Sequence, residues 1–233
     1  ISGNTAWNDK PGRIPHSWGK IPMRLRRKPW IEAALEDYSQ FVFRHPGENM
    51  QGRWQQTFGH AAPLHVELGT GKSRFVSTMA ALHPGIHYIG IEAQEGVLYY
   101  AAQKTVAQEL TNVRLLVFDV SYINTIFAPG EVNRFYLNFC DPWPKSRHAK
   151  RRLTHHRFLE MYRHLLAPGG DIHFKTDNRA LFDFSCEEFR SQGWHLDKVT
   201  YDLHHSPYHE GNVMTEYEMK FSEKGPIHRL EAR

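Results

Sequence analysis

The segment HVELGTGKS, residues 65–73, decides the fold class of this 233-residue chain. It predicts a short apolar strand that ends at Leu68, a glycine turn at residues 69–71, and a helix that runs to Leu82. Strands and helices continue to alternate along most of the chain. This alternation indicates a mainly parallel sheet covered by helices on both faces, so the expected fold class is α/β.

The same patterns give the other elements and the domain boundary. Strands are expected at residues 64–68, 86–91, 113–118, 134–139, 172–175, 194–201 and 216–221. Helices are expected at residues 31–44, 73–82, 95–110, 154–166 and 179–192, with Thr154 as a cap of the fourth helix and Pro168-Gly169-Gly170 as its end. Residues 1–22 have no period and are interpreted as an added or disordered extension. Residues 23–233 are expected to form a single domain that begins with a basic arm (Arg24–Lys28) and a helix.

Three kinds of cofactor site begin with a glycine turn after a strand, and this turn fits one of them best. A phosphate-binding loop ending in GKS needs a glycine where the chain has Val66. A dinucleotide site needs a third glycine where the chain has Arg74. Glu67 precedes the first glycine by two residues, where its carboxylate would repel a pyrophosphate but attract the sulfonium and ammonium groups of S-adenosylmethionine.

The residues at successive strand ends therefore predict an S-adenosylmethionine site. We expect Glu67 and Gly69 to hold the methionine moiety and Glu92 to bind the ribose hydroxyls. Asp119 is expected to accept a hydrogen bond from the adenine amino group, with Val120 beside the ring. The alternative is a glycine turn that only packs a helix on a strand.

The segment NFCDPWPKSRHAKRR, residues 138–152, predicts a second part of the same site. Asp141 follows an aromatic strand, and Pro142 and Pro144 stiffen the turn around Trp143. Ligands of open α/β sheets bind beyond the carboxyl ends of the strands, so an acid, a ring and cations there favour a nucleic acid base as the target. Trp143 could equally stack on a base or pack the turn. The cations either follow a phosphate backbone or form a solvated basic face.

Composition narrows the class of protein. With 40% hydrophobic and 13% aromatic residues, the chain can fill a core and is not a disordered protein. The net charge is only +4, but the basic residues are clustered, which favours a phosphate backbone as a partner. Cys140 and Cys186 are not spaced as a pair, and no apolar run is long enough to span a membrane. A cytoplasmic protein is expected.

Five motifs together resemble the bacterial tRNA (guanine-N7-)-methyltransferase family: ELGTGKS, GIEAQ, NFCDPWPKSRHAKRR, HFKTDN and TEYE, at residues 67–73, 90–94, 138–152, 173–178 and 215–218. The resemblance extends from Met23 to the C-terminus. It implies a Rossmann-like class I methyltransferase fold: a doubly wound, mainly parallel sheet of seven strands with an antiparallel last strand. It also implies methyl transfer from S-adenosylmethionine to N7 of the variable-loop guanosine of tRNA, guanosine 46.

The resemblance assigns roles to particular residues. It makes Asp141 catalytic and places it in the S-adenosylmethionine pocket with Glu67, Glu92 and Asp119. It implies that tRNA is contacted by Lys145, Arg147, His148, Ala149, Lys150, Arg151, Arg152, Asp177, Thr215, Glu216, Tyr217 and Glu218. In one departure from the family, Ser73 replaces a frequent glycine. A serine there tolerates helix geometry, so only cofactor affinity is expected to be affected.

Guanine N7 has a free lone pair, so its methylation needs no base to remove a proton beforehand. Asp141 is therefore expected to orient the guanine N1–H and amino group, or the cofactor ammonium. The rival interpretations are a non-catalytic RNA-binding module, a nicotinamide-dependent oxidoreductase, and a methyltransferase acting on DNA or another RNA. The first predicts loss of the cofactor acids and the second predicts a glycine in place of Arg74. Only the family resemblance argues against the third.

Two further expectations concern metals and assembly. His155, His156, His204, His205 and His209 suggest a metal site, but Pro207 separates the last two and no closed ligand geometry is apparent. No metal is expected. A homodimer is weakly favoured.

Overall fold

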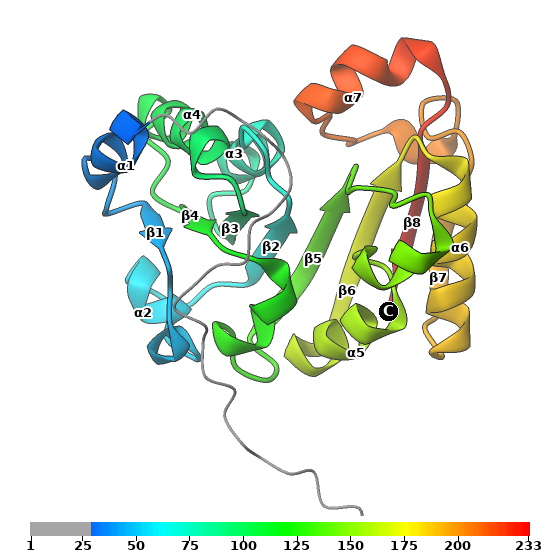
Figure 1. Ribbon diagram of the computed structural model, residues 1–233, viewed down its shortest axis with the longest axis horizontal. Coiled ribbons are helices and arrows are strands. Elements are labelled where there is room, and N and C mark those ends of the chain that lie inside the picture. The colour runs from blue at the N-terminus through cyan, green and yellow to red at the C-terminus, as the bar shows by residue number, and fades with distance from the viewer. Residues whose placement is uncertain (1–28) are drawn as a thin grey trace, which may run out of the picture.

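A computed structural model of the chain has an α/β fold in which one sheet of eight strands lies between two layers of helices (Figure 1). The structure describes residues 29–233. The predicted extension at residues 1–22 and the basic arm Arg24–Lys28 lie outside these described residues. The expected doubly wound, mainly parallel architecture is confirmed.

The strands lie side by side in the order β1-β4-β3-β2-β5-β6-β8-β7. They are β1 (Val42–Arg44), β2 (Leu64–Leu68), β3 (His87–Glu92), β4 (Val113–Val117), β5 (Val132–Asn138), β6 (Leu166–Thr176), β7 (Leu196–Thr200) and β8 (His228–Ala232). The α-helices are α1 (Pro29–Glu36), α2 (Trp54–Phe58), α3 (Arg74–Leu82), α4 (Glu95–Ala107), α5 (His156–Leu165), α6 (Arg179–Ser191) and α7 (Glu216–Phe221). The 3-10 helices are η1 (Glu48–Met50), η2 (Val120–Thr125), η3 (Ser146–Arg151), η4 (Pro207–His209) and η5 (Ser222–Lys224).

Strand β2 is the centre from which the sheet is wound. It pairs in parallel with β3 on one side and with β5 on the other, and β4 and β6 extend the parallel arrangement outward. Strand β8 runs antiparallel between β6 and β7, as expected for the last strand. The carboxyl ends of β5 and β6 point toward α7 in Figure 1.

The sheet separates two hydrophobic cores, because successive side chains of a strand point to opposite faces. Leu64, Val66 and Leu68 of β2 pack into the core that contains apolar residues of α5 and α6. The other core contains apolar residues of α1, α3 and α4, packed on side chains such as Leu115 and Tyr136. All five residues of β2 are buried: the apolar residues Leu64, Val66 and Leu68 share one face, and the polar residues His65 and Glu67 share the other.

The predicted strand at residues 216–221 is wrong, because this segment is the helix α7. The Glu-Tyr-Glu-Met-Lys-Phe sequence alternates like a strand, but Thr215 Oγ1 accepts a hydrogen bond from Glu218 N–H at 3.0 Å and caps the helix. The spacing of a threonine and a glutamate three residues later is a signal for a helix start that the strand prediction ignored. The last strand is β8 instead.

The predicted helix at 31–44 is also wrong in its second half. Helix α1 ends at Glu36, and residues 42–44 form β1, an additional strand at the edge of the sheet that pairs in parallel with β4. The sequence Phe41-Val42-Phe43 is rich in β-formers, and pairing with β4 adds backbone hydrogen bonds that a longer helix would forgo.

The ends of the fourth predicted helix differ as well. His155 rather than Thr154 caps α5, and Thr154 Oγ1 lies 2.7 Å from Ser185 Oγ of α6 in the core. The predicted terminator, Pro168-Gly169-Gly170, belongs to the first half of β6.

Within residues 29–233, no helix is both long and apolar enough to cross a membrane.

Candidate active site

The carboxyl edge of the parallel strands brings together residues that are far apart in the sequence. Leu68 at the end of β2 is in register with Ile91 of β3 and Leu137 of β5. In the same way, Asn138 of β5 is in register with Lys175 of β6. The segments that follow these strands therefore lie at one edge and carry the predicted site residues.

The glycine turn after β2 has the conformation that a ligand-binding backbone needs. Gly69 and Gly71 have φ angles of 81° and 55°, in the left-handed region that favours glycine. A Cβ atom added to either residue would meet nothing within 4 Å, so space is open above the turn. The backbone N–H groups of Gly69 and Thr70 donate to Ile91 O, which ties the turn to β3.

Glu67 lies beneath this turn and is only 2% exposed. Its carboxylate accepts hydrogen bonds from Thr70 Oγ1 at 2.6 Å and from Asn138 Nδ2 at 2.9 Å. The pKa of Glu67 is raised to about 7, because the effect of burial exceeds the opposing effects of these two hydrogen bonds and of the Lys175 charge. Near neutral pH this acid is therefore ready to ionise when a cationic ligand arrives.

Glu92 and Asp119 occupy the ends of β3 and β4. Glu92 accepts hydrogen bonds from Gln94 N–H at 3.0 Å and from Gly71 N–H at 3.3 Å, so one carboxylate links β3 to the glycine turn. Burial raises the pKa of Glu92, and the negative charge of Asp141 raises it further. One oxygen of Asp119 caps η2 by accepting from Ser121 N–H at 2.8 Å, and Val120 follows it half-buried.

Ser73 corrects one prediction from the sequence. Its φ angle is 62°, so the residue lies in the left-handed region before α3 and does not adopt helix geometry. Its hydroxyl donates to Ala101 O at 3.3 Å and accepts from Ser77 Oγ at 3.2 Å. A glycine would adopt this left-handed conformation at lower cost than the serine.

The turn after β5 is held in an unusual backbone conformation. Phe139 and Trp143 both have positive φ angles, 52° and 41°, which are uncommon for bulky residues and often mark functional sites. Asp141 lies exposed between them. Because β5 pairs with β2 and β2 pairs with β3, the turn that carries Asp141 lies at the same sheet edge as Glu67 and Glu92.

The ring of Trp143 packs within its own turn. The Arg151 guanidinium lies 4.9 Å from the ring centroid, and the His148 ring meets it edge-on at 5.8 Å. Arg152 Nε and Nη2 donate to the carbonyl oxygens of Pro142 and Trp143 at 3.1 and 3.0 Å. Of the two roles considered for Trp143, the structure favours packing of the turn.

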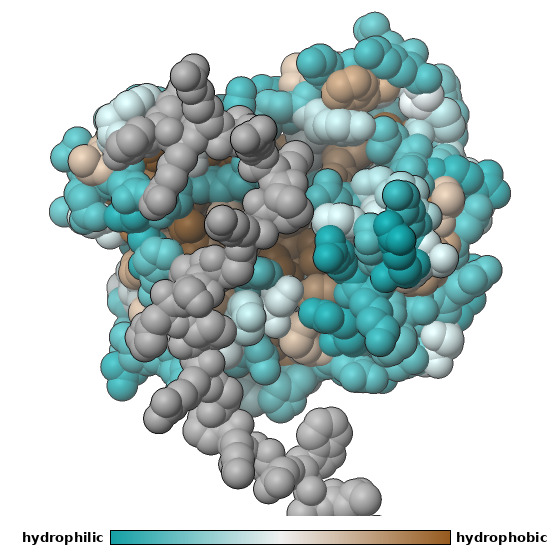
Figure 2. Space-filling view, viewed as in Figure 1, coloured by the Kyte–Doolittle hydropathy of each residue, from teal (hydrophilic) through white to brown (hydrophobic). Residues whose placement is uncertain are grey.

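The basic residues predicted to follow the tRNA backbone lie mostly on η3. Lys145, Arg147, Lys150 and Arg151 are exposed, whereas His148, Ala149 and Arg152 are half-buried. In Figure 2, strongly hydrophilic surface gathers over the part of the molecule where η3 lies. The cations therefore form a surface beside Asp141.

Helix α7 brings the remaining predicted substrate residues to the same edge, but not all of them are accessible. Tyr217 is 41% exposed, and its hydroxyl donates to Asp177 Oδ2 at 2.8 Å. Glu216 pairs with Lys104 of α4 at 3.0 Å. Glu218 is fully buried and pairs with Lys175 Nζ at 2.7 Å, so its direct contact in this structure is with β6.

Sequence reasoning missed several residues that organise the site. Thr70 and Asn138 bind the carboxylate of Glu67, and Lys175 anchors Glu218. All three belong to the motifs quoted above, so their neighbourhood was visible in the sequence. Their individual roles depend on which face of a strand each side chain occupies.

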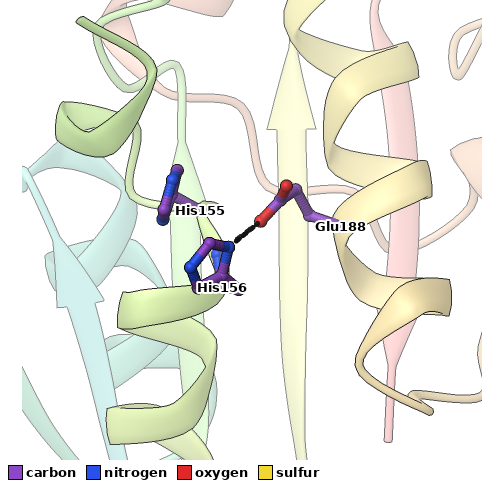
Figure 3. A group of neighbouring side chains, drawn as sticks. All are labelled: His155, His156 and Glu188. Atoms are coloured by element: carbon purple, nitrogen blue, oxygen red, sulfur yellow. Dashed lines mark hydrogen bonds and ion pairs between the residues drawn. The ribbon is translucent and has the colours of Figure 1, made fainter.

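One group among residues 29–233 could hold a metal ion: His155, His156 and Glu188 (Figure 3). Glu188 Oε2 accepts from the backbone N–H of His156 at 2.5 Å and lies 3.1 Å from its Nδ1. The centroids of the two imidazole rings lie 4.0 Å apart with the ring planes inclined by 37°, and His155 Nδ1 accepts from Arg157 N–H. These contacts cap the start of α5, and they account for all three side chains without an ion.

The fold and the site together define a class I methyltransferase: a doubly wound sheet with an antiparallel last strand, and acids at successive strand ends around a glycine turn. A family model described as a putative methyltransferase matches residues 61–230. The crystal structure of the 16S rRNA methyltransferase KamB resembles this fold with a TM-score of 0.59, at 12% identity over 76% of this chain and 90% of that one.

Closer relatives identify the family. A tRNA (guanine-N7-)-methyltransferase of Geobacillus sp. is 50% identical over 212 residues, which is 91% of this chain and 96% of that protein. The Streptococcus mutans tRNA (guanine-N7-)-methyltransferase is also 50% identical, over 91% of this chain and 100% of that protein. The chain belongs to the tRNA (guanine-N7-)-methyltransferase family.

Proposed function

We propose that the protein transfers a methyl group from S-adenosylmethionine to N7 of the variable-loop guanosine of tRNA, guanosine 46. One observation carries the proposal: Asp141 follows β5 on a stiff turn, at the sheet edge where β2 and β3 end with Glu67 and Glu92, and the basic residues of η3 come next in the chain. A base held at Asp141 can therefore meet the cofactor while its backbone lies along η3. The family membership supports the same reaction.

The described residues fit S-adenosylmethionine. The open space above Gly69 and Gly71 leaves room for a ligand, and Glu67 and Glu92 beneath and beside it suit a cationic methionine group and ribose hydroxyls. When bound, S-adenosylmethionine supplies an electrophilic methyl group on a sulfonium. Asp119 and Val120, after β4, would hold the adenine.

The contribution of the protein to the chemistry is alignment. Guanine N7 is unprotonated at neutral pH, so no residue has to accept a proton before methyl transfer. Holding N7 in line with the methyl group can contribute up to about 7–11 kcal/mol to the barrier reduction. In this proposal Asp141 accepts hydrogen bonds from the guanine N1–H and amino group and thereby directs N7 toward the cofactor.

The acceptor role of Asp141 can be tested by Asp141→Asn. An asparagine keeps the size of the side chain but loses a charged acceptor, so kcat/KM should fall on the order of 10- to 100-fold. Binding of S-adenosylmethionine, measured by calorimetry, should change much less. Near-full turnover by Asp141→Asn would contradict the role.

Two further points concern where the protein is located and whether it forms a dimer. We place it in the cytoplasm because that is where its proposed substrate is modified. The homodimer stays a prediction, and sedimentation equilibrium at several protein concentrations would test it.

The decisive experiment measures methyl transfer from labelled S-adenosylmethionine to an unmodified tRNA transcript. The control transcript carries adenosine in place of the variable-loop guanosine. Transfer should require the guanosine, and the product should cleave there after mild reduction and aniline treatment. Transfer that persists in the control would indicate another RNA position, and absence of cofactor binding would favour an RNA-binding module.

A further inference from the structure

A group of aromatic rings includes Phe139, two residues before Asp141 in the same turn. The family resemblance implies a tRNA contact for one member, Tyr217, but assigns no role to the group. Phe139 at the end of β5 lies against Tyr217 of α7, with ring centroids 5.0 Å apart and ring planes inclined by 37°. Tyr217 in turn lies 4.4 Å from Phe221 on the same helix, at an inclination of 33°. These three rings, which we call the aromatic platform, join the two segments on either side of the site.

The backbone keeps Phe139 in this place despite a conformational cost. Its φ angle of 52° is unfavourable for a bulky side chain, but its N–H donates to Lys175 O at 2.9 Å and fixes the position. Asn138 before it binds Glu67, and Asp141 follows two residues later. Phe139 therefore lies in the chain between Asn138, which binds the cofactor-site acid Glu67, and the proposed catalytic acid Asp141.

Two anchors from β6 hold α7 so that Tyr217 meets Phe139. Lys175 donates to Glu218 Oε2 at 2.7 Å in the interior, and Asp177 accepts from the Tyr217 hydroxyl at 2.8 Å at the surface. Tyr217 is nevertheless 41% exposed, so part of its ring is open to a ligand. Lys220 and Lys224 lie 5.4 and 4.6 Å from the Phe221 ring and add positive charge at the margin of the platform.

We infer that the aromatic platform binds the purine ring of the target nucleotide by stacking, with Phe139 and Tyr217 as positioning residues. The inference rests on the proposed function and adds the surface that recognises the base. Flat rings beside cations bind an unpaired base without reading its sequence, whereas Asp141 can read the guanine edge. The Tyr217 hydroxyl, held by Asp177, fixes the ring and is not itself a contact to the base.

Two substitutions of Tyr217 separate stacking from hydrogen bonding. Tyr217→Leu removes the ring and should lower kcat/KM by about 10- to 100-fold, as expected for loss of one base–ring stack. Tyr217→Phe keeps the ring and should lose less than about fivefold, since one exposed hydrogen bond is removed. Met219→Ala, on the same helix and exposed, is the control and should match the wild type. Equal losses in Tyr217→Phe and Tyr217→Leu would overturn the inference.

A direct readout does not depend on turnover or on the folding of a variant. The wild-type protein is irradiated with a tRNA transcript that carries a single 6-thioguanosine at the variable-loop position, and the cross-linked peptides are identified by mass spectrometry. Cross-links at Phe139 or Tyr217 are expected, and they should vanish when the thioguanosine is moved to the anticodon loop. Cross-links from the variable-loop position only at Trp143 or elsewhere would overturn the inference. Methylation by the wild-type protein tests the proposed function separately.

Discussion

The protonation state of Glu67 affects cofactor binding and folding stability in opposite directions. Its carboxyl group is buried, and its pKa is raised from 4.5 to about 7, chiefly by burial. A raised carboxyl pKa means that the folded state favours the protonated form. The free energy of unfolding therefore decreases as the pH rises from about 4.5 to about 7, and the ionised form that suits a cationic cofactor is the less stable one.

The affinity for S-adenosylmethionine should consequently depend on pH. If binding needs the ionised carboxylate, a pKa of about 7 gives about tenfold weaker binding at pH 6 than at pH 8. Calorimetric titration at several pH values measures this. In Glu67→Gln, binding should be weaker at pH 8 and should lose most of its pH dependence. An equally steep dependence in Glu67→Gln would assign the titration to another group.

The same substitution should stabilise the protein without cofactor. A glutamine can accept from Asn138 and donate to Thr70, so both hydrogen bonds are retained without a buried charge. We expect Glu67→Gln to increase the free energy of unfolding at pH 8 by about 1–3 kcal/mol and to change it little at pH 4.5. Denaturant unfolding at the two pH values measures the difference. A loss of stability at pH 8 would contradict this account.

At the residue scale, the sequence predicted which side chains lie at the site better than it predicted their burial and their contacts. The acids at strand ends are found at one edge because parallel strands end together. The burial of Glu218 and the packing of Trp143 were not predictable, because each depends on a partner from another part of the chain, Lys175 and Arg151. The left-handed backbone of Ser73 depends on how α3 joins the sheet.

At the scale of elements, α7 is a six-residue helix whose buried anchor is the ion pair between Lys175 and Glu218. All three protons of Lys175 Nζ have partners: Glu218 Oε2, Asn212 Oδ1 and Val213 O. Burial lowers the pKa of Lys175, and Glu218 opposes that effect. The pair therefore specifies where α7 and the preceding loop lie on the sheet.

Replacing one member of this ion pair should destabilise the protein more than replacing both members. Lys175→Met removes the lysine partner of the buried Glu218 carboxylate, which keeps contacts with His204 and Asn212. Glu218→Leu leaves the buried Lys175 ammonium without a carboxylate at its Nζ. Each single variant should lower the free energy of unfolding, by up to about 3–5 kcal/mol. The double variant should recover a large part of this loss, because neither charge remains. Denaturant unfolding of the four proteins gives the coupling energy. Additive losses would show that the two side chains act independently. The double variant should still methylate tRNA poorly, since the ion pair that anchors α7 to the sheet is lost.

Two arginines of the η3 segment differ in function, because Arg152 at its end holds the turn after β5 whereas Arg147 is exposed. Arg152 binds two carbonyl oxygens of the turn, so Arg152→Lys should disturb Asp141 and lower kcat on tRNA. Arg147 is exposed on η3, so Arg147→Ala should raise KM and reduce the slope of log affinity against log salt by about 1. Filter binding across a salt series and steady-state kinetics separate the two effects. A reduced salt slope in Arg152→Lys, or an unchanged slope in Arg147→Ala, would contradict these assignments.

Element types followed from the sequence where one period was strong, and failed where two signals competed. The strand β2 was predicted with its observed bounds because apolar residues and a glycine turn agree. Helix α7 alternates like a strand yet begins with a capping threonine, and β1 continues the apolar pattern of α1. In both cases the outcome was decided by pairing or capping with neighbours.

At the scale of the whole molecule, the two hydrophobic cores explain why the fold class was predictable. Each central strand is buried on both faces, and each connecting helix has one apolar face, so the alternation in the sequence mirrors the layers in space. The additional strand β1 was not predictable, because an edge position needs few residues and leaves a weak pattern.

The insertion of β8 between β6 and β7 has a consequence for the order in which the enzyme forms during synthesis. Strands β2 to β5, with the glycine turn and the acids around it, have all been translated by Asp141. Strand β7 lies at the edge of the sheet with β8 as its neighbour, so it has no place in the sheet until residues 228–232 have emerged from the ribosome. Helix α7 immediately precedes β8 and is fixed in the same late event. The nascent chain is therefore expected to complete the part that carries the glycine turn and its acids first. The part that carries β7 and α7 should form last, because β8, which fixes both, is among the last segments to be synthesised.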